Sequence, residues 1–239
     1  MKASEVTSRL TFFLKICKQM ENQKTPKVWF TADTHFHHAG LILRHHPQRA
    51  EIGGFDNTDI NTHDKWLMDL WNSTIGKKDT VYIIGDFSFA NRDATVRLLH
   101  NLKGEKHLIL GNHDKSSEKL TNMFKTIYQI RNVVFKKSVY PYLEEDFNVN
   151  MCHYAQVTWN MKPHGAVHIH GHSHGKLDDY NTRSKELRVD VGFDGKLANH
   201  GFIELQDLYN YFKGISQEMS FKDYTLSLRE ALNNESPLL

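Results

Sequence analysis

Short apolar runs recur along the chain, and each ends in a glycine or polar motif. Five stretches rich in apolar and β-branched residues lie at residues 28–32, 81–84, 108–110, 149–151 and 167–169, the last two interrupted by Asn150 and His168. Continuous runs of this length are typical of strands that are covered on both faces, whereas strict alternation would indicate a half-exposed sheet. The pattern therefore predicts five buried strands.

Apolar residues at helical spacing predict helices between these strands. Residues 58–71 form an amphipathic pattern that begins with Thr58 or Asp59 as the N-cap, and residues 93–102 form another. His63 lies on the inward face of the first pattern and is interpreted as a packed helix residue. Strands that alternate with such helices favour an α/β fold.

The later part of the chain has a different pattern. Short β-rich pieces at residues 127–130, 133–135 and 139–142 predict a second group of strands that pair antiparallel. The remaining predictions are strands at residues 187–191 and 201–204, a helix at residues 206–212 and an amphipathic helix at residues 5–20. We expect a helical N-terminal extension at residues 1–26, one catalytic domain at residues 27–214 and a peripheral tail at residues 215–239.

The composition indicates the size class and the cellular compartment of the protein more than its function. The chain has 239 residues, which suits a single domain with a full hydrophobic core. Lys and Arg number 30 against 28 Asp and Glu, so nucleic acid stays open as a partner but charge does not argue for it. With two cysteines and no apolar stretch of spanning length, we expect a cytoplasmic protein without disulfides, targeting segment or membrane contact. The oligomeric state is not indicated.

Each of the five apolar runs leads into residue types that commonly bind metal ions in proteins. In chain order the motifs are Asp33-Thr34-His35, Gly85-Asp86, Gly111-Asn112-His113-Asp114, Cys152-His153 and Gly171-His172-Ser173-His174. Open α/β sheets build their sites at the carboxyl ends of strands, so we expect these motifs to meet there. Taken singly, each motif also fits a turn or a cap, because Asp, Asn and Gly favour both. The ordered set favours a metal site.

The residue types suit a two-metal centre. Asp33 and His35 are two positions apart, as are His172 and His174, so in an extended chain both members of a pair project to the same side and close on one ion. Two cations about 4 Å apart need a bridging carboxylate, and Asp86 follows its strand without a paired ligand of its own. Carboxylate, amide and imidazole ligands without thiolate suit manganese, iron, zinc, cobalt or nickel more than calcium, and we expect two divalent ions, with manganese preferred.

Taken together, these motifs resemble the calcineurin-like metallophosphoesterase superfamily, whose pattern is Asp-x-His, Gly-Asp, Gly-Asn-His-Asp/Glu, His and Gly-His-x-His. The resemblance spans residues 28–205. Finer features are similar to a branch of small bacterial and phage phosphoesterases, namely residues 31–38, Trp71-Asn72, Gly85-Asp86-Phe87 and residues 170–175. The resemblance implies an α/β fold with two β-sheets packed face to face and helices on both outer sides, a four-layer α/β/β/α sandwich.

The resemblance also implies a ligand set and roles for single residues. One metal is held by Asp33, His35, Asp86 and His174, and the second by Asp86, Asn112, His153 and His172. The implied reaction is hydrolysis of a small phosphomonoester or phosphodiester, with nucleotides among the candidates, by in-line attack of a metal-bound hydroxide. His113 protonates the leaving oxygen or steadies the phosphoryl group, and Asp114 orients His113 or caps the next turn. Apart from the resemblance, His38 flanks the first motif, and we expect it either to contact substrate phosphate or to be a supporting or simply exposed residue.

Two alternatives remain, a metal-dependent nuclease and an interaction scaffold that keeps the fold without catalysis. A scaffold would be expected to lack ligands, and none is missing. A serine/threonine protein phosphatase is disfavoured because Gly85-Asp86 is not followed by the second acid and Arg-Gly of that branch. The DNA-repair exonuclease branch has an additional capping domain, for which this chain is too short.

Several residues near the motifs have a plainer interpretation. We expect His168 and His170 to support the site without binding metal, and Cys152 to pack in the core. Asp190 and Asp194 are interpreted as turn residues, with contact to the site as the alternative.

Overall fold

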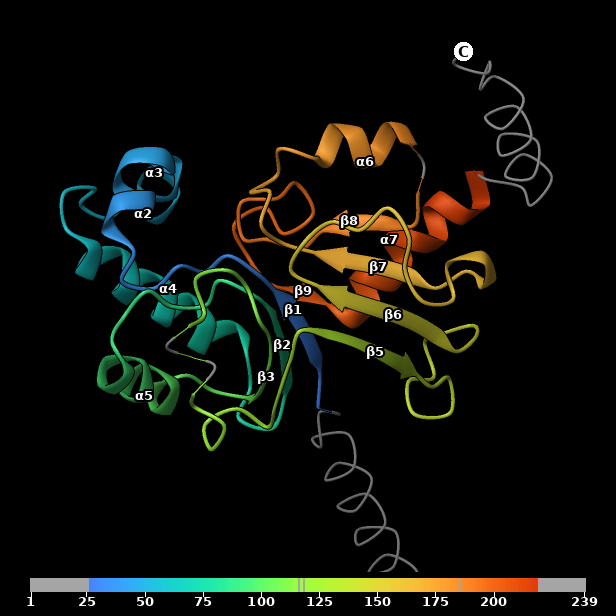
Figure 1. The fold of residues 1–239 in the computed structure, drawn as a ribbon, viewed down its shortest axis with the longest axis horizontal. Coiled ribbons are helices and arrows are strands. Elements are labelled where there is room, and N and C mark those ends of the chain that lie inside the picture. Colours follow the sequence, from blue (N-terminus) through green and yellow to red (C-terminus); the bar gives the residue numbers. More distant parts are fainter. Residues whose placement is uncertain (1–25, 116, 118, 185, 219–239) are drawn as a thin grey trace, which may run out of the picture.

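The computed structural model describes residues 26–218 except 116, 118 and 185, and it shows an α/β protein with two mixed β-sheets (Figure 1). The helix predicted at residues 5–20 lies outside the described residues. Among the helices that are described, none combines the length and the apolar character needed to cross a membrane.

The first sheet has five strands in the order β4-β3-β2-β1-β9. Strands β1 to β4 run parallel, and β9 pairs antiparallel with β1 at one edge. Their bounds are β1 Val28–Thr31, β2 Thr80–Ile84, β3 Glu105–Ile109, β4 Thr126–Tyr128 and β9 Ile203–Glu204.

The second sheet has four strands in the order β5-β6-β7-β8. Strands β6, β7 and β8 are parallel, and the edge strand β5 is antiparallel to β6. Their bounds are β5 Ile130–Phe135, β6 Phe147–Cys152, β7 Val167–His170 and β8 Arg188–Asp190. The five predicted buried strands are thus confirmed as β1, β2, β3, β6 and β7.

Six α-helices occur within the described residues: α2 Ala39–His45, α3 Gln48–Gly53, α4 Ile60–Thr74, α5 Arg92–Asn101, α6 Asp178–Ser184 and α7 Leu205–Glu218. A short 3-10 turn, η1, spans Lys162–His164. The Asp59 side chain caps α4 by accepting the Asn61 backbone N–H at 2.9 Å, and His63 is buried on its inner face, both as predicted. Helices α2, α3 and α6 were not predicted, since they are short and carry few buried apolar residues. Helix α7 continues past the predicted domain boundary at residue 214.

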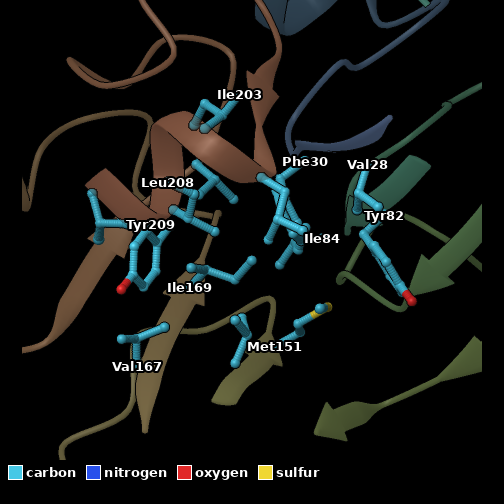
Figure 2. Packing of buried hydrophobic residues seen from close by; sticks show 14 of the residues in the cluster. Val28, Phe30, Tyr82, Ile84, Met151, Val167, Ile169, Ile203, Leu208 and Tyr209 are labelled. Atoms are coloured by element: carbon cyan, nitrogen blue, oxygen red, sulfur yellow. The ribbon is translucent and has the colours of Figure 1, made fainter. Parts of the chain in front are cut away.

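The two sheets share one hydrophobic cluster. Val28 and Phe30 of β1 and Ile84 of β2 meet Met151 of β6 and Ile169 of β7, and Figure 2 shows these side chains converging. On the other face of the first sheet, alternate residues pack against α4 and α5 in a second cluster that includes Trp29, Val81, Ile83, Leu67, Trp71 and Leu98. Because neighbouring positions face two different cores, β2 is an unbroken apolar run from Val81 to Ile84. The complete four-layer order stays a prediction.

Two predictions for residues 126–149 are wrong. The first β-rich piece became β4, which pairs parallel with β3 in the first sheet, so only β5 shows the expected antiparallel pairing. Residues 139–142 form no strand; the chain turns there, with the backbone N–H groups of Val139 and Tyr140 both donating to the Lys136 carbonyl. β-branched and aromatic residues favour strands only where a partner strand is available.

Candidate metal centre

The five motifs occupy the loops that directly follow β1, β2, β3, β6 and β7. Backbone hydrogen bonds continue beyond the strand ends and hold these loops together: Asp33 N–H donates to the Gly85 carbonyl at 3.0 Å and His35 N–H to the Asp86 carbonyl at 3.0 Å. In the second sheet, Gly171 N–H donates to the His153 carbonyl at 3.0 Å. Strand register therefore determines how the motif residues line up.

The local backbone at the motifs is left-handed rather than extended. Asp33, His35, Asp86, His172 and His174 have φ values of 56°, 50°, 52°, 67° and 48°. The expectation that an extended chain aligns the paired side chains is therefore wrong. Asp33 and His35 do fall in one group of candidate ligands, whereas His172 and His174 fall in two different groups. Each such non-glycine conformation costs on the order of 1–3 kcal/mol and persists only where the surroundings hold it, which is common at functional sites.

The first group of candidate ligands is Asp33, His35 and His174, whose ligand atoms lie within 4.8 Å of one another. His35 is buried, and its Nε2 has no hydrogen-bond partner. That nitrogen lies 3.9 Å from Asp33 Oδ1 and 3.6 Å from Asp86 Oδ2. Burial lowers the pKa of His35 to about 2, so the ring is neutral with a free lone pair. A buried nitrogen without a partner beside two carboxylates fits a bound cation.

The second group is Asp86, His153 and His172, again within 4.8 Å. His153 Nδ1 donates to the Ile84 carbonyl at 2.9 Å, which leaves Nε2 3.5 Å from Asp86 Oδ2 and 3.2 Å from Asn112 Oδ1. The same Asp86 oxygen thus faces His35 in the first group and His153 in the second. This is the arrangement that a bridging carboxylate requires.

The pKa values of the buried groups show that the site favours a bound positive charge. Burial raises the pKa of Asp33 to about 7, and nearby histidines only partly oppose this effect. For His153, burial works to lower the pKa, but the hydrogen bond to Asp86 and the charges of Asp33 and Asp86 outweigh it and raise the pKa to about 9. Carboxylates that draw a proton onto a buried histidine would bind a divalent cation in its place.

Glycines allow the loops to approach the carboxylates. A Cβ added at Gly111 would lie 2.2 Å from Asp86 Oδ1, and one at Gly85 would lie 2.2 Å from His153 Nδ1. Such distances are impossible for real atoms, so only glycine fits at these two positions. The glycines of the motifs therefore have a direct steric function in the site.

The residues expected to act on substrate lie at the same loops. His113 is half-buried, its backbone N–H donates to Asp86 Oδ1 at 2.9 Å, and its ring is edge-on to the His35 ring at 5.7 Å. His38 has its Nδ1 3.1 Å from His35 Nδ1 and stacks on the exposed Phe89 ring at 4.1 Å.

Asp114 holds two of the motif loops together. Its buried carboxylate accepts the backbone N–H groups of Asp86, Phe87 and Gly111 at 2.8, 3.0 and 2.8 Å. No hydrogen bond to the His113 ring was found among the described residues. Asp114 therefore joins the loops after β2 and β3, and a role in orienting His113 stays a prediction.

A third group, His46, His174 and Asp194, was missed by sequence reasoning. Asp194 is not a plain turn residue, because its Oδ2 accepts from His174 Nδ1 at 2.8 Å and both of its oxygens accept from Arg49. The charge of Arg49 overcomes the effect of burial, which alone would raise the pKa of Asp194, and holds it well below the ordinary range. Since Arg49 already neutralises this carboxylate, the group does not suit a cation. Arg49 and Asp194 are 145 residues apart, and no local pattern joins them.

Other residues near the motifs support the loops. Asp190 accepts from Ser173 Oγ and from the backbone N–H groups of Gly175 and Gly192, which is a wider role than a turn. His168 and His170 are buried, and Cys152 packs in the core as expected. His168 Nε2 accepts the Gln156 N–H at 3.1 Å. The His37 ring pairs with Asp64 at 2.8 Å.

Comparison with known proteins finds relatives whose functions are not described. The chain is 27% identical to the gene 66 protein of Mycobacterium phage L5 over 205 residues, which covers 77% of this chain and 94% of the relative. It is 30% identical over 171 residues to the uncharacterized protein MJ1445 of Methanocaldococcus jannaschii, covering 69% of this chain and 81% of that protein. This chain belongs to the MJ1445 family. No family model matches.

The MJ1445 relationship is accompanied by a similar solved fold. A protein of unknown function, AQ665 from Aquifex aeolicus, superposes with a TM-score of 0.53 at 20% identity, over 78% of this chain and 99% of that one. This likeness concerns the fold alone. The printed names assign no activity, so a function for this member of the MJ1445 family has to be argued from the site.

Proposed function

We propose that this protein is a dinuclear metal-dependent phosphoesterase that hydrolyses a small phosphomonoester or phosphodiester. The observation that carries the proposal is the sharing of Asp86 between two His/Asp groups, with the unpartnered His35 Nε2 on one side and His153 Nε2 on the other. Two cations joined by one carboxylate are a recurring arrangement in enzymes that act on phosphate esters.

The residues present fit such ions. We assign Asp33, His35, Asp86 and His174 to one cation, and Asp86, Asn112, His153 and His172 to the other. The hydrogen bonds of His153 and His174 engage Nδ1, so Nε2 is the nitrogen left to bind metal. Hard oxygen and imidazole donors without thiolate favour manganese, with iron, zinc, cobalt and nickel as alternatives.

When bound, the ions would supply an activated water and neutralise charge on the phosphoryl oxygens. The chain's own groups would do the remaining work. The His113 ring, beside His35 and at the less buried side of the site, would hold a proton toward the oxygen that leaves phosphorus. His38 would contact the substrate from its place beside His35 and Phe89. The two-sheet fold with a shared core keeps these loops at one place, and we include the four-layer arrangement in the proposal.

The test is metal-dependent hydrolysis by purified protein. Protein reconstituted with Mn²⁺ should cleave a chromogenic bis-aryl phosphodiester, EDTA should abolish the activity, and added Mn²⁺ should restore it. A matched panel of monoesters, diesters, cyclic nucleotides and single-stranded nucleic acid would define the preferred ester. Preference for the nucleic acid would support a nuclease, and metal-loaded protein inactive on the whole panel would support a scaffold.

A further inference from the structure

We propose that Asp194, itself held by Arg49, is a positioning residue that aims His174 at one of the two cations. This inference rests on the proposed metal centre and adds to it residues from α3 and from the loop after β8. The pair contributes no ligand. It acts by restricting the tautomer and the orientation of the His174 ring.

The contact between Asp194 and His174 determines which ring nitrogen is free. Asp194 Oδ2 lies 2.8 Å from His174 Nδ1, and an ionised carboxylate only accepts hydrogen bonds. The hydrogen of the neutral ring is therefore on Nδ1, and its lone pair is on Nε2. His174 also has a left-handed backbone, with φ of 48°, so its direction is not set by regular secondary structure. A carboxylate behind a ligating imidazole fixes such a ring and strengthens it as a ligand.

Arg49 keeps Asp194 in place by a two-pronged contact. Its Nε donates to Oδ1 at 2.8 Å and its Nη2 donates to Oδ2 at 2.7 Å, with the arginine side chain completely buried. The guanidinium plane lies over the Phe193 ring, 4.8 Å from the centroid. Both the fork geometry and the stacking are properties that lysine lacks.

The same guanidinium reaches the first motif. Nη2 donates to the Asp33 carbonyl at 2.8 Å and Nη1 donates to the Thr34 carbonyl at 3.1 Å. Arg49 thus connects the backbone that holds Asp33 to the carboxylate that orients His174. These two ligands come from opposite ends of the motif series and from different sheets, so the arginine sets their relative position.

The other groups around Asp194 are consistent with a positioning role. His46 Nδ1 lies 3.4 Å from Oδ2 and its ring stacks on His174 at 4.5 Å, while His200 Nδ1 lies 3.6 Å from Oδ1. With Arg49 bound to both oxygens, these rings complete the surroundings of the carboxylate. The effect should be confined to the cation bound by Asp33, His35 and His174, because none of the residues of the second group contacts Asp194 in the described hydrogen bonds and ion pairs.

The experiment measures binding of Co²⁺ and Mn²⁺ to full-length protein by calorimetry and by the Co²⁺ absorption spectrum. Asp194→Asn and Arg49→Lys should each lower the affinity for one of the two ions by about 10–100-fold and change the absorption bands of that ion. The other ion should bind as in the wild type. Asp207→Asn, an exposed aspartate on α7, is the matched control and should bind both ions normally. Circular dichroism verifies that each variant is folded. If Asp194→Asn does not fold, the ion affinities of Arg49→Lys test the inference.

A double-mutant cycle separates positioning from a general structural effect. If Asp194 acts through His174, His174→Ala should lower the affinity for the same ion. Adding Asp194→Asn to that variant should then cause little further loss of affinity. Folded variants that bind both ions with wild-type affinity and spectrum would overturn the inference, as would additive losses in the cycle. Wild-type protein that binds two ions but hydrolyses no ester would refute the proposed function and leave this inference standing. Wild-type protein that binds no divalent ion would refute both.

Discussion

Asp86 is the residue on which both candidate cation positions depend. One of its oxygens lies 3.6 Å from His35 Nε2 and 3.5 Å from His153 Nε2, and its other oxygen accepts the His113 N–H at 2.9 Å. The hydrogen bond to His153 and the neighbouring charges overcome burial and lower the pKa of Asp86 to about 2, so it is ionised across the physiological range.

We predict that Asp86→Asn lowers activity more than a change at any other single ligand, because an amide oxygen cannot bridge two cations with full charge. Metal content, measured by elemental analysis after dialysis, should fall as well. Asp69→Asn, on the exposed face of α4, is the control. An Asp86→Asn protein that keeps two ions and near-native turnover would show that the bridge is assigned wrongly.

His113 should affect chemistry rather than metal binding. His113→Ala is expected to lower kcat by roughly 100-fold or more with unchanged metal stoichiometry, as for loss of a general acid. The rate of hydrolysis should fall more for alkyl esters than for aryl esters, because a good leaving group needs little protonation. His100→Ala, exposed on α5, controls for the loss of an imidazole. Equal falls in rate for both ester types would indicate that His113 positions the phosphate and does not act as the general acid.

At the scale of elements, the loops after the strands depend on glycine for close approach. Gly111 brings the loop after β3 against Asp86 in the loop after β2, whereas Gly40 in α2 has nothing within 4 Å of an added Cβ. Both residues can be changed to alanine, which gives a matched pair of variants.

We expect Gly111→Ala to lower the free energy of unfolding by about 1–3 kcal/mol through overpacking and to reduce Mn²⁺ binding by displacing Asp86. Gly40→Ala should be neutral or add about 0.5–1 kcal/mol, since alanine is favoured within a helix. Urea denaturation and Mn²⁺ titration of both variants test this pair. Wild-type Mn²⁺ affinity in Gly111→Ala would contradict the proposed steric role.

At the scale of the whole molecule, the candidate centre joins the two sheets. Asp33, His35 and Asp86 follow strands of the first sheet, while His153 and His174 follow strands of the second. Bound cations would therefore add links between sheets that already meet through apolar packing and through hydrogen bonds such as that of His153 Nδ1 to the Ile84 carbonyl.

Mn²⁺ should accordingly raise the Tm of the protein. At an ion concentration of 100 times Kd, a single site contributes about 2.7 kcal/mol, or about 5–10 °C for a chain of this size. Thermal scans with EDTA and with increasing Mn²⁺ measure the shift. Asp86→Asn should show a much smaller rise than the wild type, and an equal rise in both would place the stabilising ion elsewhere.

The sequence by itself determined the five buried strands, the main helices and the order of the candidate ligands. Apolar runs such as residues 81–84 depend on burial on both faces, and the capped pattern beginning at Asp59 depends on local helix geometry. These signals are local, so they could be read without the fold. The motif residues also stand in the chain directly after strands, which indicated where a site would form.

Only the tertiary structure decided which distant segments meet. Strand partners for residues 126–128 and the absence of one for residues 139–142 depend on where the sheets end, and the left-handed backbone at Asp33 and His174 depends on the loops packed around it. The contact between Arg49 and Asp194 joins a short helix to a late loop across 145 residues. Such contacts produce no periodic pattern in the sequence, because the two charges interact only when folding brings them together and buries them.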